Sequence, residues 1–157
     1  MANFILTPLY EDVYGNSFSP IEFSNRMKMQ KLVYLLQEAG LSVGEYNFYW
    51  YKHGPYSQQL QEDILAVNHI KSDNKISYSD TARYIVSRVK NALSTNSDYT
   101  LDWWAECLAS LQYLRSNIFS KNTCDEEIIN ELKKRKPHLN KDAENRKALE
   151  IVKELYN

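Results

Sequence analysis

Residues 27–40 read MKMQKLVYLLQEAG and begin the part of the sequence that decides the fold. Apolar residues recur there at intervals of three and four positions, which places them along one face of a helix. Gly40 follows as a stop signal, because glycine readily takes the left-handed backbone conformation that ends many helices. We expect a helix from about Ser24 to Ala39, and we expect it to be central to the core.

Residues 46–57 read YNFYWYKHGPYS, and here the helical period gives way to alternation. An alternating run of aromatic residues predicts a strand over residues 46–52, with one ring-rich face toward the core. Tyr49 and Tyr51 belong to the opposite face, because successive side chains of a strand point to opposite sides. They are candidates for contact with another molecule.

The corner Gly54-Pro55 follows this strand. We expect it to stop strand pairing and bend the chain, because proline has no N–H to donate and glycine adopts backbone angles closed to other residues. Ser57 is then the expected N-cap of the next helix, since its oxygen can accept a hydrogen bond from an N–H of the first turn. The strand therefore turns directly into a helix.

The rest of the chain is predicted to be mainly helical. Helices are expected near residues 4–14, 57–67, 80–93, 100–117, 123–137 and 140–155, and a hairpin or extended excursion near 70–78. Asp80 is expected to cap one helix, and Thr123 with Glu126 forms a T-x-x-E capping box at the start of another. The predicted fold class is mainly α (α+β), a compact single domain (1–157) of about six or seven helices with a small antiparallel β-sheet or wing.

The composition is that of an ordinary globular protein. Hydrophobic residues make up 43% of the 157 residues, and 19 basic side chains stand against 20 acidic ones, for a net charge of -1. Proteins that bind by neutralising phosphates usually show a clear basic excess, so nucleic acid is not the favoured partner. The unusual feature is the content of 12 tyrosines, 3 tryptophans and 5 phenylalanines, because such rings serve interfaces as well as cores.

Cysteine use and the N-terminal sequence predict a cytoplasmic protein that holds no metal or cofactor. The cysteines are Cys107 and Cys124, with no CxxC motif and no histidine at ligand spacing, so neither a zinc site nor a disulfide framework is expected. The N-terminus lacks the basic segment and continuous apolar core of a signal peptide. No run reaches the roughly 18 apolar residues that a membrane span requires.

Several stretches carry a resemblance to a group of small prokaryotic and phage proteins. MKMQKLVYLLQEAG followed by FYWYKHGPYSQQLQEDI is similar to a KLQKLVYL-type helix paired with an aromatic strand that ends in Y-G-P-Y/V-S. LASLQYLRSN followed by EEIINELKKRKPHLNKDAENRKALEIVKEL resembles a C-terminus in which a helix ends in a K-P-H segment before a final helix. From Lys28 to its end, the chain thus resembles the YwgA-like proteins and the Panacea (SocA-like) domain.

The resemblance implies a protein partner. Panacea domains look like antitoxins or proteolytic adaptors that bind and neutralise unrelated toxin proteins, so the implied partner is a toxin, an effector or a protease component in toxin-antitoxin or phage-defence systems. This chain has K-H-G-P-Y-S at residues 52–57, where Panacea proteins usually have a shorter Y/R-G-P-V-type turn. That difference places it nearer the YwgA-like branch.

The histidines supply no complete catalytic set. His53 lies at a strand end, where an imidazole could act as acid or base, but no G-x-S-x-G motif, activated cysteine or sequence-adjacent acid accompanies it. We expect His53 to have a structural or binding role, and the isolated His138 to be a cap, core or surface group. No catalytic and no metal-binding residue is assigned.

The basic run Lys133–Lys136 and the pair Trp103-Trp104 each have two interpretations. The run lies at a helix end, where cations interact favourably with the helix dipole, so we favour a solvated helix end over nucleic-acid binding. Neighbours on a helix diverge by about 100 degrees, so at least one of the two tryptophans faces away from the core. Trp103 exposed beside Tyr99 would be a binding hot spot, and a covered pair is equally compatible with the sequence.

We favour a non-enzymatic protein-binding module, an antitoxin, adaptor or phage-related inhibitor that neutralises a partner protein. The alternatives are a winged-helix-like DNA-binding transcriptional regulator, for which residues 70–90 and the Lys133–Lys136 run are the candidate contacts, and a small hydrolase or nuclease centred on His53. For the favoured hypothesis, aromatic anchors provide affinity and the polar corner provides specificity. The predicted partner-binding residues are Tyr49, Tyr51, Lys52, His53, Gly54, Pro55, Tyr56 and Trp103.

Overall fold

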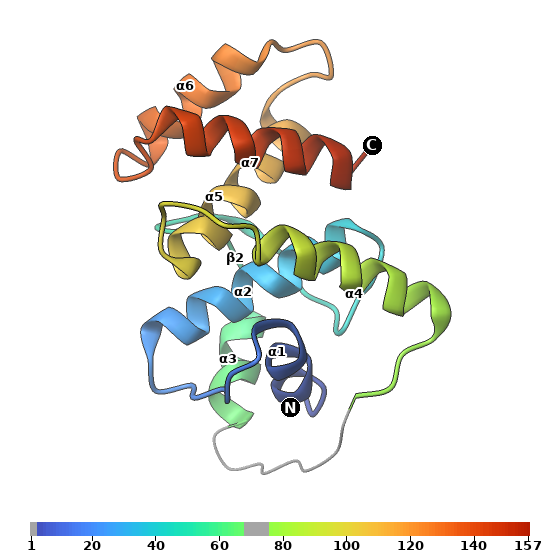
Figure 1. The fold of residues 1–157 in the computed structure, drawn as a ribbon. Coiled ribbons are helices and arrows are strands. Elements are labelled where there is room, and N and C mark those ends of the chain that lie inside the picture. Colours follow the sequence, from blue (N-terminus) through green and yellow to red (C-terminus); the bar gives the residue numbers. More distant parts are fainter. Residues whose placement is uncertain (1–2, 68–75) are drawn as a thin grey trace.

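The computed structural model describes residues 3–67 and 76–157, which form a mainly helical protein with one small β-hairpin (Figure 1). The α-helices are α1 (Leu6–Tyr14), α2 (Phe23–Glu38), α3 (Gln58–Ala66), α4 (Asp80–Leu93), α5 (Leu101–Tyr113), α6 (Asp125–Arg135) and α7 (Asp142–Leu155). A π-helical turn, η2 (Leu114–Ile118), continues α5, and the strands are β1 (Tyr49–Tyr51) and β2 (Gly54–Tyr56). The predicted fold class, mainly α with a small antiparallel sheet, is confirmed.

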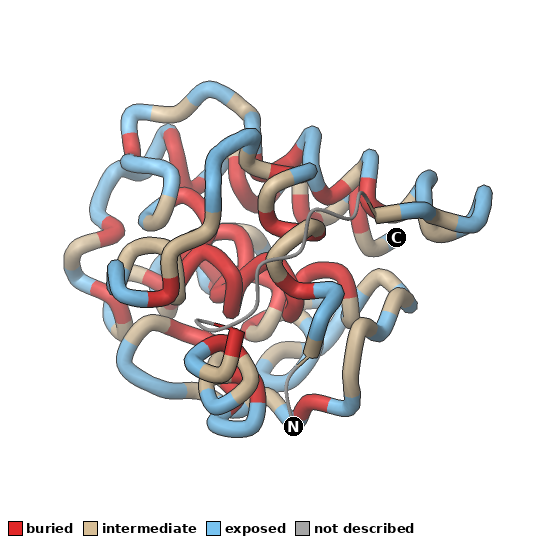
Figure 2. The backbone as a smooth tube through the Cα atoms, turned by 90° about the horizontal axis from the view of Figure 1, so that it is seen from below, coloured by how far each residue is buried: buried red, intermediate tan, exposed pale blue. Residues whose placement is uncertain are grey.

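Helices α2 and α5 form the centre of the molecule and pack against each other. Every residue of α2 from Met27 to Leu36 is buried, and so is every residue of α5 from Trp104 to Gln112. Figure 1 shows α6 and α7 together at one end and α1 and α3 at the other, while Figure 2 shows the buried segments gathered inside the exposed ones. The prediction that the helix of residues 24–39 is central is confirmed.

The middle of helix α2 is buried on all sides because it separates two hydrophobic clusters. Leu32 and Leu35 belong to the larger cluster, which α4, α5, α6 and α7 complete. Met29 and Val33 belong to the smaller cluster, which α1 and α3 complete. Burial of one such side chain contributes about 1.5–3 kcal/mol to the stability of the fold.

Among the described residues, none of the helices combines the length and the apolar run that a bilayer crossing requires.

The hairpin differs from the predicted sheet. β1 pairs antiparallel with β2, with Tyr49 opposite Tyr56 and Tyr51 opposite Gly54. The prediction that Gly54-Pro55 stops pairing is wrong, because each strand of a two-stranded ribbon is an edge, where a proline is tolerated. The expected second strand near 70–78 falls partly outside the described residues, and residues 76–78 form no strand.

Side-chain caps confirm some of the predicted helix starts and contradict others. Ser57 Oγ accepts a 3.2 Å hydrogen bond from the Leu60 N–H, as predicted. For α4, Ser79 rather than Asp80 is the cap, because its Oγ accepts from the N–H of Ala82. Asp80 instead contributes a negative charge to the first turn, where the helix dipole favours it.

The predicted capping box at Thr123 is wrong. The N-cap of α6 is Cys124, and no side chain caps this helix end. The carboxylate of Glu126 accepts a hydrogen bond from Arg146 of α7, so it does not reach back to the chain before the helix. A contact between helices α6 and α7 has therefore replaced the local interaction.

The hairpin lies directly against α5 at one glycine. Gly54 has a φ of 86°, a backbone conformation that residues other than glycine rarely adopt. A Cβ added there would lie 2.4 Å from Ser110 Oγ on α5. Gly54 therefore provides both the turn of the backbone and the close approach of the hairpin to the central helix.

Gly54→Ala is expected to lower the free energy of unfolding by about 2–4 kcal/mol, because backbone strain and overpacking add. Gly40→Ala is the matched control: Gly40 has a φ of 97° but no atom within 4 Å of an added Cβ, so only strain applies. Urea unfolding of both variants measures the difference. Ser110→Ala in the Gly54→Ala background should recover the steric part, and equal losses at Gly54 and Gly40 would contradict the close approach.

Candidate functional site

A fully buried carboxylate lies behind the hairpin. Glu106 of α5 is completely inaccessible to solvent, and its Oε1 forms a 3.0 Å hydrogen bond with the His138 Nε2. The His53 Nδ1 lies 3.9 Å from the same oxygen, and the Lys136 Nζ lies 3.9 Å from Oε2. One acid thus faces basic groups from the hairpin and from the segment after α6.

Two buried lysines hold the hairpin through its backbone. Lys31 of α2 is 1% exposed, and its Nζ donates a 2.7 Å hydrogen bond to the carbonyl of Pro55. Lys136 is 4% exposed, and its Nζ donates to the carbonyls of Tyr51, at 3.0 Å, and Lys52. A buried charge is tolerated only when it is hydrogen-bonded and paired. Here the carbonyls accept hydrogen bonds from both lysines, and Glu106 supplies one negative charge for the two.

Burial shifts the protonation of the basic groups around this site. It lowers the pKa of Lys31 to about 7, although the negative charge of Glu106 acts in the opposite direction. Burial also lowers the pKa of Lys136, again opposed by Glu106. The pKa of His53 lies below its usual 6.5, mainly because of burial. Lys31 therefore titrates near neutral pH.

The outer face of the hairpin carries three tyrosines in mutual contact. We call Tyr49, Tyr51 and Tyr56 the tyrosine cluster; their ring centroids lie 5.1–6.2 Å apart. Tyr49 is 44% exposed and Tyr51 is 47% exposed, as the alternation predicts. Nearby, the exposed Phe23 of α2 packs its ring edge to face with His53, at 5.0 Å between centroids.

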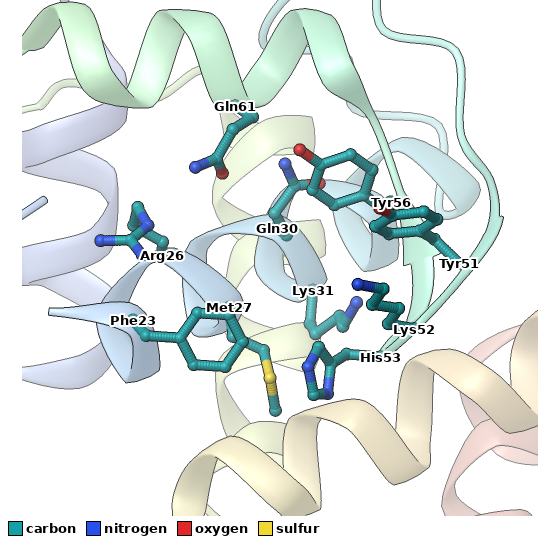
Figure 3. A pocket seen from close by; sticks show the side chains of 10 residues that line it. All are labelled: Phe23, Arg26, Met27, Gln30, Lys31, Tyr51, Lys52, His53, Tyr56 and Gln61. Carbon is teal, nitrogen blue, oxygen red and sulfur yellow. The ribbon is translucent and has the colours of Figure 1, made fainter.

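A pocket of about 200 Å³ lies between the N-terminal part of α2 and the hairpin. Figure 3 shows side chains from both elements and from α3 around it. Phe23 and Met27 give it an apolar side, and Tyr51 and Tyr56 connect it to the tyrosine cluster. Its basic residues are Arg26, Lys31, Lys52 and His53.

Of the other predicted partner-binding residues, some are exposed and some are buried. Lys52 is exposed at the turn of the hairpin, whereas Gly54 and Pro55 are buried and shape the strand. Trp103 is exposed and Trp104 is buried, so one of the two tryptophans faces away from the core, as the helical geometry requires. The ring of Trp103 contacts Tyr99 and His138.

The solvated basic helix end predicted at residues 133–136 is wrong for Lys136. Helix α6 ends at Arg135, and the chain then directs Lys136 inward to the hairpin. The preceding residues form ion pairs, Arg135 with Glu131 at 2.7 Å and Lys133 with Asp142 at 2.9 Å. The run therefore does not form one basic surface.

Sequence reasoning missed the buried network because its members are far apart along the chain. His53 has no acid beside it in sequence, yet Glu106 approaches it in the fold. A signal was present: Glu106 interrupts an apolar helical run, and Lys31 directly precedes one. A charge in such a run indicates either an exposed face or a buried partner, and helices buried on all sides leave only the second.

Comparison of the chain with protein-family models, with curated proteins and with solved structures finds no match. The resemblance to YwgA-like and Panacea proteins therefore stays a prediction. Within residues 3–67 and 76–157, no group of three or more His, Cys, Asp or Glu side chains is placed to hold a metal ion.

Glu106→Gln is expected to lower the free energy of unfolding by about 3–5 kcal/mol, because it leaves buried cations without their counter-charge. Glu126→Gln is the matched control: it removes an exposed acid that pairs with Arg146, and such pairs contribute less than about 1 kcal/mol. Urea unfolding at pH 7 compares the two. Similar losses for both variants would show that Glu106 does not balance the lysines.

Lys31 should also make stability depend on pH. Its pKa is about 7 in the folded protein against a usual 10.5, so between these values the unfolded chain binds more protons and stability rises with pH. We expect Lys31→Met to remove about 2 kcal/mol of the rise between pH 7 and 9.

Unfolding measured at several pH values gives this difference between the wild type and Lys31→Met. The exposed Lys134→Met should follow the wild type. The lost hydrogen bond to Pro55 shifts the Lys31→Met curve without changing its slope, so parallel curves for wild type and Lys31→Met would contradict the low pKa.

Proposed function

We propose that the chain is a non-enzymatic, cytoplasmic protein-binding module, an antitoxin, adaptor or phage-related inhibitor that binds and neutralises a partner protein. The observation that carries this proposal is the tyrosine cluster on the outer face of the hairpin. Tyr49 and Tyr51 remain exposed and Tyr56 is partly exposed, and such rings in mutual contact form the kind of surface on which protein interfaces concentrate their binding energy. The implied partner is a toxin, an effector or a protease component.

The anchoring of the hairpin supports the same proposal. Lys31 and Lys136 hold the carbonyls of Tyr51, Lys52 and Pro55, so the backbone that carries the tyrosines is fixed before any partner arrives. A fixed surface loses less conformational entropy on binding than a mobile loop. The tyrosine cluster is thus suited to act as a preorganised binding surface.

The two alternatives have less support. In a hydrolase centred on His53, the imidazole would need an acid within hydrogen-bonding distance to orient it. His53 Nδ1 lies 3.9 Å from Glu106, and Glu106 forms its hydrogen bond with His138 instead. A DNA-binding regulator would gain from a basic surface, but Lys136 is buried and Arg135 pairs with Glu131.

Tyr49→Ala and Tyr51→Ala are each expected to weaken partner binding by about 2 kcal/mol or more, roughly thirtyfold, while the fold stays intact. The binding partner for the test is the product of the adjacent gene, coexpressed and then titrated in purified form. Tyr84→Ala is the matched control, because Tyr84 is an exposed tyrosine on α4.

Circular dichroism and thermal unfolding check that the variants remain folded. Unchanged affinity in both hairpin variants would contradict the role of the tyrosine cluster. A wild-type chain that neither binds the neighbouring product nor protects cells from it would contradict the proposed function as a whole.

A further inference from the structure

We propose that the pocket beside the tyrosine cluster binds the C-terminal residue of a partner chain, with its carboxylate among the bases and its apolar side chain against Phe23 and Met27. The inference rests on the proposed function, since it names the part of a protein partner that this surface recognises. It starts from the charge of the pocket: Arg26, Lys31, Lys52 and His53 line it, and the described lining residues include no carboxylate. A negatively charged ligand is complementary to such a lining.

The bases differ in how free they are to bind an anion. Arg26 Nη1 already donates to the carbonyls of Pro20 and Ile21, at 2.7 and 2.8 Å, so this nitrogen of the guanidinium is occupied by its own chain. The Lys31 ammonium has three donors, and the carbonyl of Pro55 occupies one. Figure 3 shows Lys31, Lys52 and His53 toward the same end of the pocket. This end is the expected position of the carboxylate.

The buried ammonium of Lys31 lacks full electrostatic compensation. Glu106 is the acid that favours its charged form, and that carboxylate also faces Lys136, His53 and His138. The low pKa of Lys31 reflects this balance, because burial outweighs the attraction of Glu106. A ligand carboxylate would supply the missing negative charge.

The dimensions and lining favour a chain terminus over a larger anion. Pockets for whole cofactors and drug-sized ligands measure about 300–1,000 Å³, whereas this one measures about 200 Å³, which suits a single residue. The pocket joins a basic end to an apolar side formed by Phe23 and Met27. A C-terminal residue carries a carboxylate and an apolar side chain on one Cα. In an internal aspartate or glutamate the side chain itself bears the charge, so the same residue has no apolar side chain for Phe23 and Met27.

The remainder of the bound chain has a defined route out of the pocket. Tyr51 and Tyr56 line the pocket and also belong to the tyrosine cluster. The residues that precede the terminus can therefore pack on those rings as they leave. One surface would then combine a charged end-recognition site with an aromatic contact area.

Binding of a carboxylate should also depend on pH. The groups that face Lys31 are Glu106 of α5, which favours its protonation, and Lys136, which disfavours it, while His53 and Lys52 face it from the hairpin. A ligand anion favours the charged form of Lys31, so above about pH 7 binding takes up a proton. Affinity for the carboxylate should fall as the pH rises above 7.

The test titrates N-acetyl-leucine, N-acetyl-leucine amide and acetate into the full chain at pH 6.5, and follows the Met27 methyl and His53 imidazole signals by NMR. We expect saturable shifts with N-acetyl-leucine, and roughly tenfold weaker binding of the amide and of acetate, because one lacks the charge and the other the apolar group. Lys52→Met should weaken binding of the acid about tenfold and leave the amide unchanged. Lys134→Met, at an exposed lysine elsewhere, should change neither.

Each contrary outcome overturns the inference in a distinct way. Equal affinity for the acid and the amide would remove the carboxylate from recognition, and equal affinity for acetate would leave a simple anion site. Absence of any shift up to the solubility limit would remove the site. In those cases the chain could still bind the neighbouring gene product, and Tyr49→Ala would still weaken that binding. Failure of this inference is therefore distinguishable from failure of the proposed function.

Discussion

The burial of two ammonium groups beside one carboxylate constrains the rest of the structure. Lys31 and Lys136 lie inside the protein, where an isolated charge would be unstable by several kcal/mol. Each is tolerated because a hairpin carbonyl accepts its hydrogen bond and because Glu106 is near. The hairpin, the central helices and the segment after α6 must therefore come together for any of the three charges to be buried.

This requirement explains how so small a sheet keeps a fixed position. Each strand has 3 residues, and an isolated hairpin of that length is at best marginally stable in water. Here the hairpin is held from behind by two lysines and rests on α5 at Gly54, so its order is imposed by tertiary contacts. Its outer face is left to the tyrosines, and the pocket opens at its edge.

Local patterns predicted those features that local physics determines. Helical spacing identified α2 and its central position, and strand alternation identified Tyr49 and Tyr51 as outward-facing. The partner of β1 was missed because Gly54-Pro55, which usually ends a strand, forms the paired strand itself. The capping box failed for a related reason, since Glu126 makes an interhelical contact that its sequence neighbourhood does not contain.

Only the outer face of the candidate site could be predicted, because that face depends on residues close together in sequence and the inner face on residues far apart. The tyrosine cluster follows from alternation within one short segment, whereas Glu106, Lys136 and His138 come together behind the hairpin only after the chain has folded. The lysines bind backbone carbonyls, which every residue type presents. Side chains on the outer face of β1 can therefore change without loss of the anchoring bonds. A hairpin held in this way allows the proposed binding surface to vary while the buried network stays the same.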